Sequence, residues 1–187
     1  TIAPTAEGVP ISFFGTKGVD NATNPAILFL GRHNTGGGNT DLSATVPLSE
    51  WRNRATSLMF VYGNGDLKLV KSGATLGYGT GTGGTVTQAT NRTTGVTLST
   101  STGAITTNNT SLAAGASATF TVTNTVVTAI DVVVLAIKAG QTNKETSVAV
   151  TAVAAGSFDI TVHNKNATTA ETGSIIINFV VIKGATS

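Results

Sequence analysis

Four carboxylates in the second half of the chain are the residues best suited by type to acid–base chemistry: Asp131, Glu145, Asp159 and Glu171. A glycoside hydrolase holds two such groups about 5 to 9.5 Å apart. The four stand singly in the sequence, so no spacing selects a pair. The aromatic side chains that a sugar-cleaving site normally offers fall instead at alternating positions typical of a core, at Phe120, Phe158 and Phe179. We therefore expect no catalytic residues and no enzyme.

Three other features could bind a ligand. His33 and Asp41 flank a glycine-rich loop, but two metal ligands in such a loop are weak support for a site, and a surface loop is the simpler interpretation. Gly79–Gly84 spells GxGxxG, which binds dinucleotides only where a helix follows it, whereas the residues after Gly84 alternate like a strand. His163 falls on the polar side of its strand, as a solvated or interface residue. We expect no cofactor and no metal.

The composition excludes further classes of protein. Only 11% of the residues are charged and 40% are apolar, so a folded chain whose surface is kept in water by hydroxyl and amide groups is expected. The net charge of +2 is spread over both halves, and without a basic face we expect no nucleic acid as partner. The absence of cysteine excludes disulfides and thiolate-bound metals.

No segment indicates a membrane or a secretory signal. The longest apolar runs, Ala26–Leu30, Val132–Ile137 and Ile175–Ile177, are far shorter than the roughly 20 residues of a membrane helix. Residues 1–20 lack a basic start followed by an apolar run. We expect no membrane partner.

The glycine-rich stretch Gly77–Gly84 is predicted to be a hinge that divides the chain into two domains. Residues 1–76 are predicted to form an extended arm, over residues 1–12 with Pro4 and Pro10, and a small β-rich domain. Within that domain Ala26–Leu30 predicts a buried strand. The segments 57–62 and 67–70 predict a hairpin, because Asn64-Gly65 between them supplies the positive φ angles of a tight turn.

Residues 85–187 predict a second domain with about eight strands between closely spaced turns. Apolar and polar residues alternate through Phe120 and Val122, and again through Phe158, Ile160 and Val162. Short strands without helices between them indicate an all-β fold, an antiparallel β-sandwich of the jelly-roll kind. In the last strand the second face is also apolar, which predicts a homo-oligomer, a trimer in preference to a dimer, through Ile176, Val180 and Ile182.

A series of short blocks fills the second domain in this order: Gly84–Thr90, Thr94–Leu98, Leu112–Ala116, Phe120–Asn124, Asp131–Val134, Val153–Phe158 and Ile176–Gly184. In order and spacing these blocks resemble the β-module that recurs at the C-terminus of tailed-phage virion proteins, and they extend over more than half of the chain. The resemblance implies a bacteriophage particle protein, either a capsid decoration (cement) protein or a fibre tip. Residues 1–76 carry no such resemblance.

Of these two functions we expect the decoration protein, because the chain has no heptads and no repeated shaft motif. It would be made in the cytoplasm of the host bacterium, bind the major capsid protein on the outer head surface and stabilise the shell. The alternative is a tail or head fibre tip that contacts a host surface glycan or an outer-membrane protein, and a minor virion connector is a third hypothesis. The candidates for capsid attachment are the apolar residues of the arm and those just after it: Ile2, Pro4, Val9, Pro10, Ile11, Phe13 and Phe14. Ile27–Leu30 are further candidates, although they suit the core of the first domain equally well.

Overall fold

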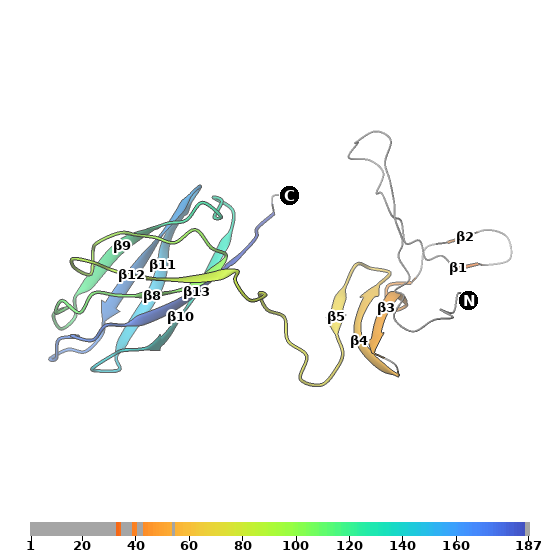
Figure 1. The fold of residues 1–187 in the computed structure, drawn as a ribbon, viewed down its shortest axis with the longest axis horizontal. Coiled ribbons are helices and arrows are strands. Elements are labelled where there is room, and N and C mark those ends of the chain that lie inside the picture. The colour runs from red at the N-terminus through yellow and green to blue at the C-terminus, as the bar shows by residue number, and fades with distance from the viewer. Residues whose placement is uncertain (1–32, 35–38, 41–42, 54, 186–187) are drawn as a thin grey trace. The chain divides into compact units, whose positions relative to one another are not determined.

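The structure is a computed structural model that describes residues 33–34, 39–40, 43–53 and 55–185. The chain divides into two compact units, Thr1–Leu76 and Gly77–Ser187. The described residues form strands, turns and loops without any helix, so the predicted all-β fold is confirmed (Figure 1). Accordingly, no helix in these ranges is long and apolar enough to cross a membrane.

The first unit contains two small antiparallel sheets. One consists of β1 (His33–Asn34) and β2 (Asn39–Thr40), and the other has the order β3-β4-β5, formed by β3 (Pro47–Asn53), β4 (Thr56–Tyr62) and β5 (Leu67–Leu69). The predicted arm (residues 1–12) and the predicted strand Ala26–Leu30 lie outside the described residues.

The predicted hairpin is confirmed as β4 and β5, although its turn differs in detail. Gly65 has a φ of 88°, but Asn64 is not among the residues with positive φ. Gly65 N–H donates to the Tyr62 carbonyl at 2.9 Å, and Tyr62 N–H donates to the Asp66 carbonyl at 2.9 Å. The loop is therefore one residue longer than the two-residue turn that Asn-Gly favours, and it closes with glycine alone in the left-handed region.

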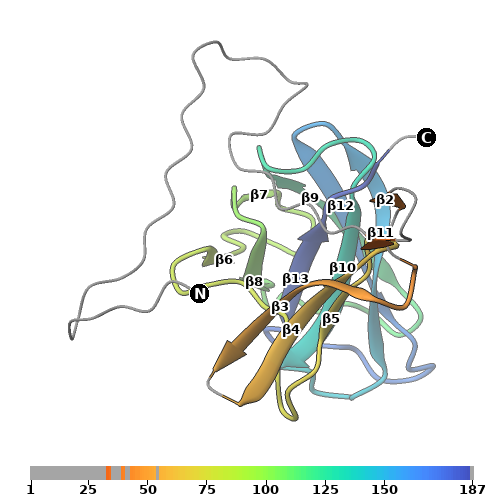
Figure 2. The same ribbon diagram turned by 90° about the vertical axis from the view of Figure 1, so that its right-hand side faces the viewer.

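The second unit is a β-sandwich of two four-stranded sheets, β10-β13-β8-β6 and β11-β12-β9-β7. Figures 1 and 2 show the two sheets as separate layers. The eight strands are β6 (Gly83–Thr87), β7 (Val96–Thr97), β8 (Thr102–Thr106), β9 (Ser117–Thr123), β10 (Val132–Ala139), β11 (Thr146–Ala154), β12 (Ser157–Asn164) and β13 (Ile176–Ile182).

The core lies between the two sheets and follows the alternation in the sequence. In β12, Phe158, Ile160 and Val162 are buried while the residues between them are partly exposed. The Phe158 ring meets Phe179 of the opposite sheet with 5.4 Å between the ring centroids. Each fully buried side chain of this size stabilises the fold by about 1.5 to 3 kcal/mol, so this unit has a core of its own.

Each sheet of the sandwich ends in a parallel pair, which the prediction of an antiparallel sandwich did not include. β6 pairs with β8 and β7 pairs with β9 in parallel, while the other pairs in the sandwich are antiparallel. The chain passes from one sheet to the other at each step from β6 to β9, so strands two apart return to the same sheet in the same direction.

The glycine-rich segment is partly built into the sandwich. Gly83 and Gly84, which the sequence assigned to a hinge, pair with Thr102 and Gly103 as strand residues. The Tyr78 hydroxyl donates to the Val181 carbonyl at 2.7 Å. A strand follows the GxGxxG pattern, so the helix that a dinucleotide site requires is not formed there.

Two loops meet closely at one end of the sandwich. A Cβ atom added to Gly173 would lie 1.8 Å from the Gly140 carbonyl oxygen, and one added to Gly140 would lie 1.9 Å from the Ser174 carbonyl oxygen. Gly140 also has a φ of 90°. Only glycine fits at these two positions: the space excludes a side chain at both, and at Gly140 the backbone conformation does so as well.

Candidate functional site

Glu171 is a fully buried carboxylate at the end of the sandwich where these loops meet. Its Oε1 accepts hydrogen bonds from Thr142 N–H at 2.9 Å and Gly173 N–H at 2.7 Å, and its Oε2 accepts one from the Thr146 hydroxyl at 3.0 Å. Burial raises the pKa of Glu171, but the hydrogen bonds from Thr142, Gly173 and Thr146 together lower it to about 2. The carboxylate is therefore an anion that fixes the loop between β10 and β11.

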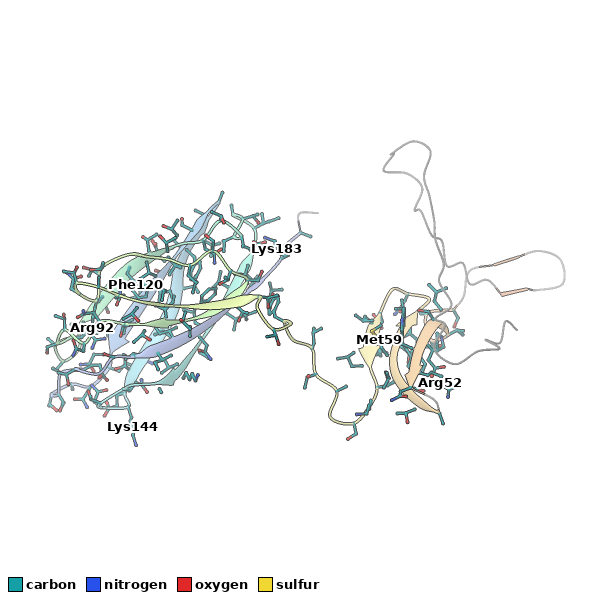
Figure 3. All side chains as sticks on the ribbon, viewed as in Figure 1. Arg52, Met59, Arg92, Phe120, Lys144 and Lys183 are labelled. Atoms are coloured by element: carbon teal, nitrogen blue, oxygen red, sulfur yellow. The ribbon has the colours of Figure 1, made fainter. Side chains whose placement is uncertain are left out.

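Arg92 is buried in the same polar cluster and labelled near that end in Figure 3. Its guanidinium donates to the carbonyls of Thr110 at 2.6 Å, Gly173 at 2.8 Å and Glu171 at 3.3 Å, and to the Thr107 hydroxyl at 3.1 Å. Burial lowers the pKa of Arg92, and the charge of Glu171 opposes that shift. Four acceptors from two loops, residues 107–110 and 171–173, thus converge on one cation.

Two buried amides complete this polar cluster. Gln88 Nε2 donates to the carbonyls of Arg92 at 3.1 Å and Thr94 at 2.8 Å, and Gln88 Oε1 accepts from Asn108 N–H at 3.0 Å. Asn164 Nδ2 donates to the carbonyls of Leu112 and Thr169. Within the described residues no buried side-chain nitrogen or oxygen lacks a hydrogen-bond partner. Every polar atom here is occupied by the fold, so the cluster acts as a structural element.

Asp131 fixes the opposite end of the sandwich, where Figure 3 labels Lys183. The Asp131 carboxylate forms an ion pair with Lys183 and accepts hydrogen bonds from Thr128 N–H at 2.8 Å and Gly184 N–H at 3.0 Å. The bond from Lys183 is the main reason that the pKa of Asp131 lies well below its usual range. This carboxylate ties the start of β10 to the end of β13.

The other two carboxylates that the sequence singled out have partners of their own. Glu145 Oε1 accepts from Asn166 Nδ2 at 2.9 Å, and Asp159 Oδ1 accepts from the Thr121 hydroxyl at 2.7 Å. Each of the four carboxylates is thus hydrogen-bonded within its own surroundings, and none is hydrogen-bonded to another. His33 lies in β1 and Asp41 lies outside the described residues. The described residues contain no group of three or more histidine, aspartate or glutamate side chains that could hold a metal ion.

The outer face of the β11-β12-β9-β7 sheet carries hydroxyl groups paired across strands, and we call it the hydroxyl face. The hydroxyls of Thr119 and Thr161 are 2.7 Å apart, and Thr161 also lies 3.1 Å from the Thr151 hydroxyl. Ser117 Oγ is 2.8 Å from His163 Nδ1, so His163 is a half-buried member of this face. The polar side chains on this face form hydrogen bonds with one another and also remain accessible to water.

The outer face of the β10-β13-β8-β6 sheet is different, and we call its aliphatic part the apolar face: Val132, Val134, Val180 and Ile182. Ile130, in the turn just before β10, is also exposed. Val132 stands opposite Ile182, and Val134 opposite Val180. The exposed fractions are 48% for Ile130, 55% for Val132, 46% for Val134 and 54% for Ile182. Contiguous exposed aliphatic side chains of this kind are typical of contact surfaces.

The predicted oligomer-interface residues fall on this side of the sandwich. Val180 and Ile182 belong to the apolar face, while half-buried Ile176 lies on the same side at the other end of β13. Ile130, Val132 and Val134 were not predicted as contact residues. The signal for Val132 and Val134 was the run Val132–Ile137, since a strand in a two-layer sandwich has only one of its two faces covered. Ile130 lies outside this run.

The β3-β4-β5 sheet of the first unit has a second exposed apolar surface, which we call the front row. Trp51, Met59 and Leu69 stand opposite one another across the three strands, and Val61 stands opposite Leu67. Trp51 is 50% exposed and Leu67 57%. No residue of 43–53 and 55–76 is buried, so the described part of this sheet covers none of its own apolar side chains fully.

The predicted attachment residues lie outside the described residues: Ile2, Pro4, Val9, Pro10, Ile11, Phe13 and Phe14, and also Ile27–Leu30. No match was found for the chain among protein-family models, curated proteins or solved structures.

Proposed function

We propose that this chain is a decoration protein that binds the outer surface of a bacteriophage head and clamps neighbouring capsid subunits together. The front row carries the proposal. A three-stranded sheet is stable when a hydrophobic face is covered, and the exposed Trp51, Leu67 and Leu69 supply such a face with no cover among the described residues. The resemblance of residues 84–184 to a virion β-module supports the phage particle as the setting.

The mechanism is mechanical. Pressure from packaged DNA separates capsid subunits, and a protein that bridges them adds an interface that must break before the shell opens. Interfaces of standard size bury about 1,200 to 2,000 Å². The front row and the arm would contribute to this interface, with Trp51 as an anchor, since buried tryptophan dominates the energy of many interfaces.

The sandwich suits the outward position. Among its described residues the sandwich has a hydrophobic core of its own, and the buried polar side chains at both ends are all hydrogen-bonded. Its fold therefore does not depend on the capsid, and we assign capsid binding to the first unit. Charged side chains contribute little to the front row and to the apolar face. Attachment should therefore persist in about 1 M salt, where exposed ion pairs are screened.

The test uses heads that lack the protein, purified from the phage that encodes it, and a pelleting assay at low and high salt. The full chain should pellet with heads in both conditions. Trp51→Asp and a deletion of residues 1–12 should abolish pelleting, while Lys71→Asp, an exposed change outside the strands, should bind like the unchanged chain. Circular dichroism must show the same β-signal for all variants.

Failure of the full chain to bind heads would overturn the proposal. If Trp51→Asp and the deletion of residues 1–12 bind heads as well as the full chain does, the front row and the arm have no role in attachment. The number of copies per virion separates the decoration protein, present in many copies over the shell, from a fibre tip, present in few.

A further inference from the structure

β10 is an edge strand with one side open. In the order β10-β13-β8-β6 it is the outermost strand, and among the residues that the structure describes it pairs with β13 alone (Figure 1). Its register with β13 is regular over Val132–Ile137, and a bulge follows between Ile137 and Ala139. The N–H and C=O groups on its free side form a template for another strand.

We propose that two copies of the chain pair along β10, antiparallel and related by a two-fold axis, so that their β10-β13-β8-β6 sheets join into one continuous sheet. The apolar face of each copy would then meet that of the other across the junction. The contact uses residues of the sandwich alone, so it stands apart from the proposed function.

The usual protection of an edge strand is absent from most of β10. Natural edges are shielded by charged residues, proline or bulges. Residues 132–137 contain no charge and no proline, and the bulge and Lys138 come only at the end of the strand. The six residues before them remain regular and open to pairing.

The other edges of the sandwich are less suitable. β11 carries its bulge in the middle of the strand, between Val150 and Ala152. β7 has two residues, and β6 has five, of which two are glycine. β10 is therefore the one long and regular edge among the described strands of the sandwich.

The charge distribution favours a second copy as the partner. A two-fold axis places the same residues on both sides of the junction, so a charged side chain near the axis would lie close to the same charge of the other copy, which destabilises a pair of strands. The nearest charges at the start of β10, Asp131 and Lys183, are paired with each other within one copy. The uncharged residues 132–137 of β10 can pair with the same strand of a second copy without this repulsion. The pairing also occupies the free edge of β10 in both copies.

Sedimentation of the full chain over a range of micromolar concentrations provides the first test, with a dimer expected. Val134→Lys should raise the dissociation constant more than about tenfold, because it loses apolar contact and brings two positive charges to the junction. Val134→Glu should do the same, and an equal mixture of the two variants should recover the dimer. Thr119→Lys, an exposed change on the hydroxyl face, should leave the dimer intact.

Cross-linking gives the second test, since the chain has no cysteine of its own. Single-cysteine variants at Val132, Val134 and Ala136 should include at least one that forms a disulfide-linked dimer on oxidation, and Thr119→Cys should form none. A monomer at all concentrations, a trimer, or a dimer unaffected by Val134→Lys would overturn the proposal. Unchanged melting temperatures of the variants would show that dissociation, and not unfolding, is measured.

Discussion

In both sheets of the sandwich, inward and outward side chains alternate along the strands, but one outer face presents hydroxyl groups to solvent and the other presents aliphatic groups. On the hydroxyl face Thr119, Thr161 and Thr151 are hydrogen-bonded across three strands. On the apolar face Val132 and Ile182 stand opposite each other with about half of each side chain exposed. Both sheets bury the same kind of residue inward. The sheet that carries the exposed aliphatic side chains is therefore the side on which the proposed contact between copies falls, whereas the other sheet presents hydroxyl groups to water.

Breaking the buried polar cluster at the end of the sandwich, which holds the loops of both sheets, should have the largest effect. Arg92→Leu removes the donors that bind the carbonyls of Thr110 and Gly173, and should lower the free energy of unfolding by about 3 to 5 kcal/mol. Because both faces depend on one core, thermal unfolding should remain a single transition. The exposed change Lys144→Leu serves as control with a shift near zero. Two separate transitions in Arg92→Leu would show that the two sheets unfold independently.

Acid should weaken the fold through Glu171. Its pKa is about 2 in the folded chain against 4.5 for the free side chain. A depressed folded pKa stabilises the protein above pH 4.5, and this contribution of about 3 kcal/mol is lost as the pH falls toward 2. Calorimetry from pH 6 to about 2 should therefore show falling melting temperatures. Glu171→Gln should start lower and flatten this dependence, while an unchanged slope would contradict the assignment.

Converting the apolar face into a hydroxyl face should abolish self-association with little loss of stability. The triple change Val132→Thr, Val134→Thr and Ile182→Thr affects exposed positions only, where substitutions usually alter stability by about 0.5 kcal/mol each or less. Sedimentation should give a monomer, and the binding of a hydrophobic dye should fall. The matched control is the same number of Thr→Ser changes on the hydroxyl face.

The reverse conversion should have the smallest effect on stability. Thr119→Val and Thr161→Val together remove two hydrogen bonds between exposed hydroxyls, Thr119–Thr161 and Thr161–Thr151. The change should be about 1 kcal/mol or less, because exposed hydroxyls can bond to water instead and the net gain from bonding to each other is small. A loss of several kcal/mol would mean that the hydroxyl pairs are structural. Chemical denaturation measures this directly, and any gain in self-association would show how readily a second contact face arises.

The sequence predicted those features that depend on local pattern. Strict alternation identified β9 and β12, and Gly65 marked the hairpin between β4 and β5. The parallel pairing of β6 with β8 could not be predicted, because strand order depends on contacts between distant segments. The buried charges were missed for a similar reason: Arg92 and Glu171 are 79 residues apart, and neither has neighbours in the sequence that indicate burial.

The candidate surfaces were predicted in part. The apolar second face of β13 was evident from Val180 and Ile182, but Val132 and Val134 became part of it only through their register with β13. Whether the residues of an apolar run are core or surface depends on which face of the sheet they point to, and in this two-layer sandwich the outer faces of both β10 and β13 have no covering layer among the described residues.

The close contact between Gly140 and Gly173 limits how this protein can diversify. A methyl group at either position would overlap the backbone of the facing loop, so the two loops cannot change separately. Lys144, in the same loop as Gly140, is exposed and has a φ of 58°, which asparagine and glycine also tolerate. In a library randomised over residues 140–145, selection for folded protein should therefore keep glycine alone at 140 and select glycine, asparagine and unbranched polar residues over β-branched ones at 144. This end of the sandwich can therefore vary only at exposed loop positions, while the contact between Gly140 and Gly173 beneath them stays fixed.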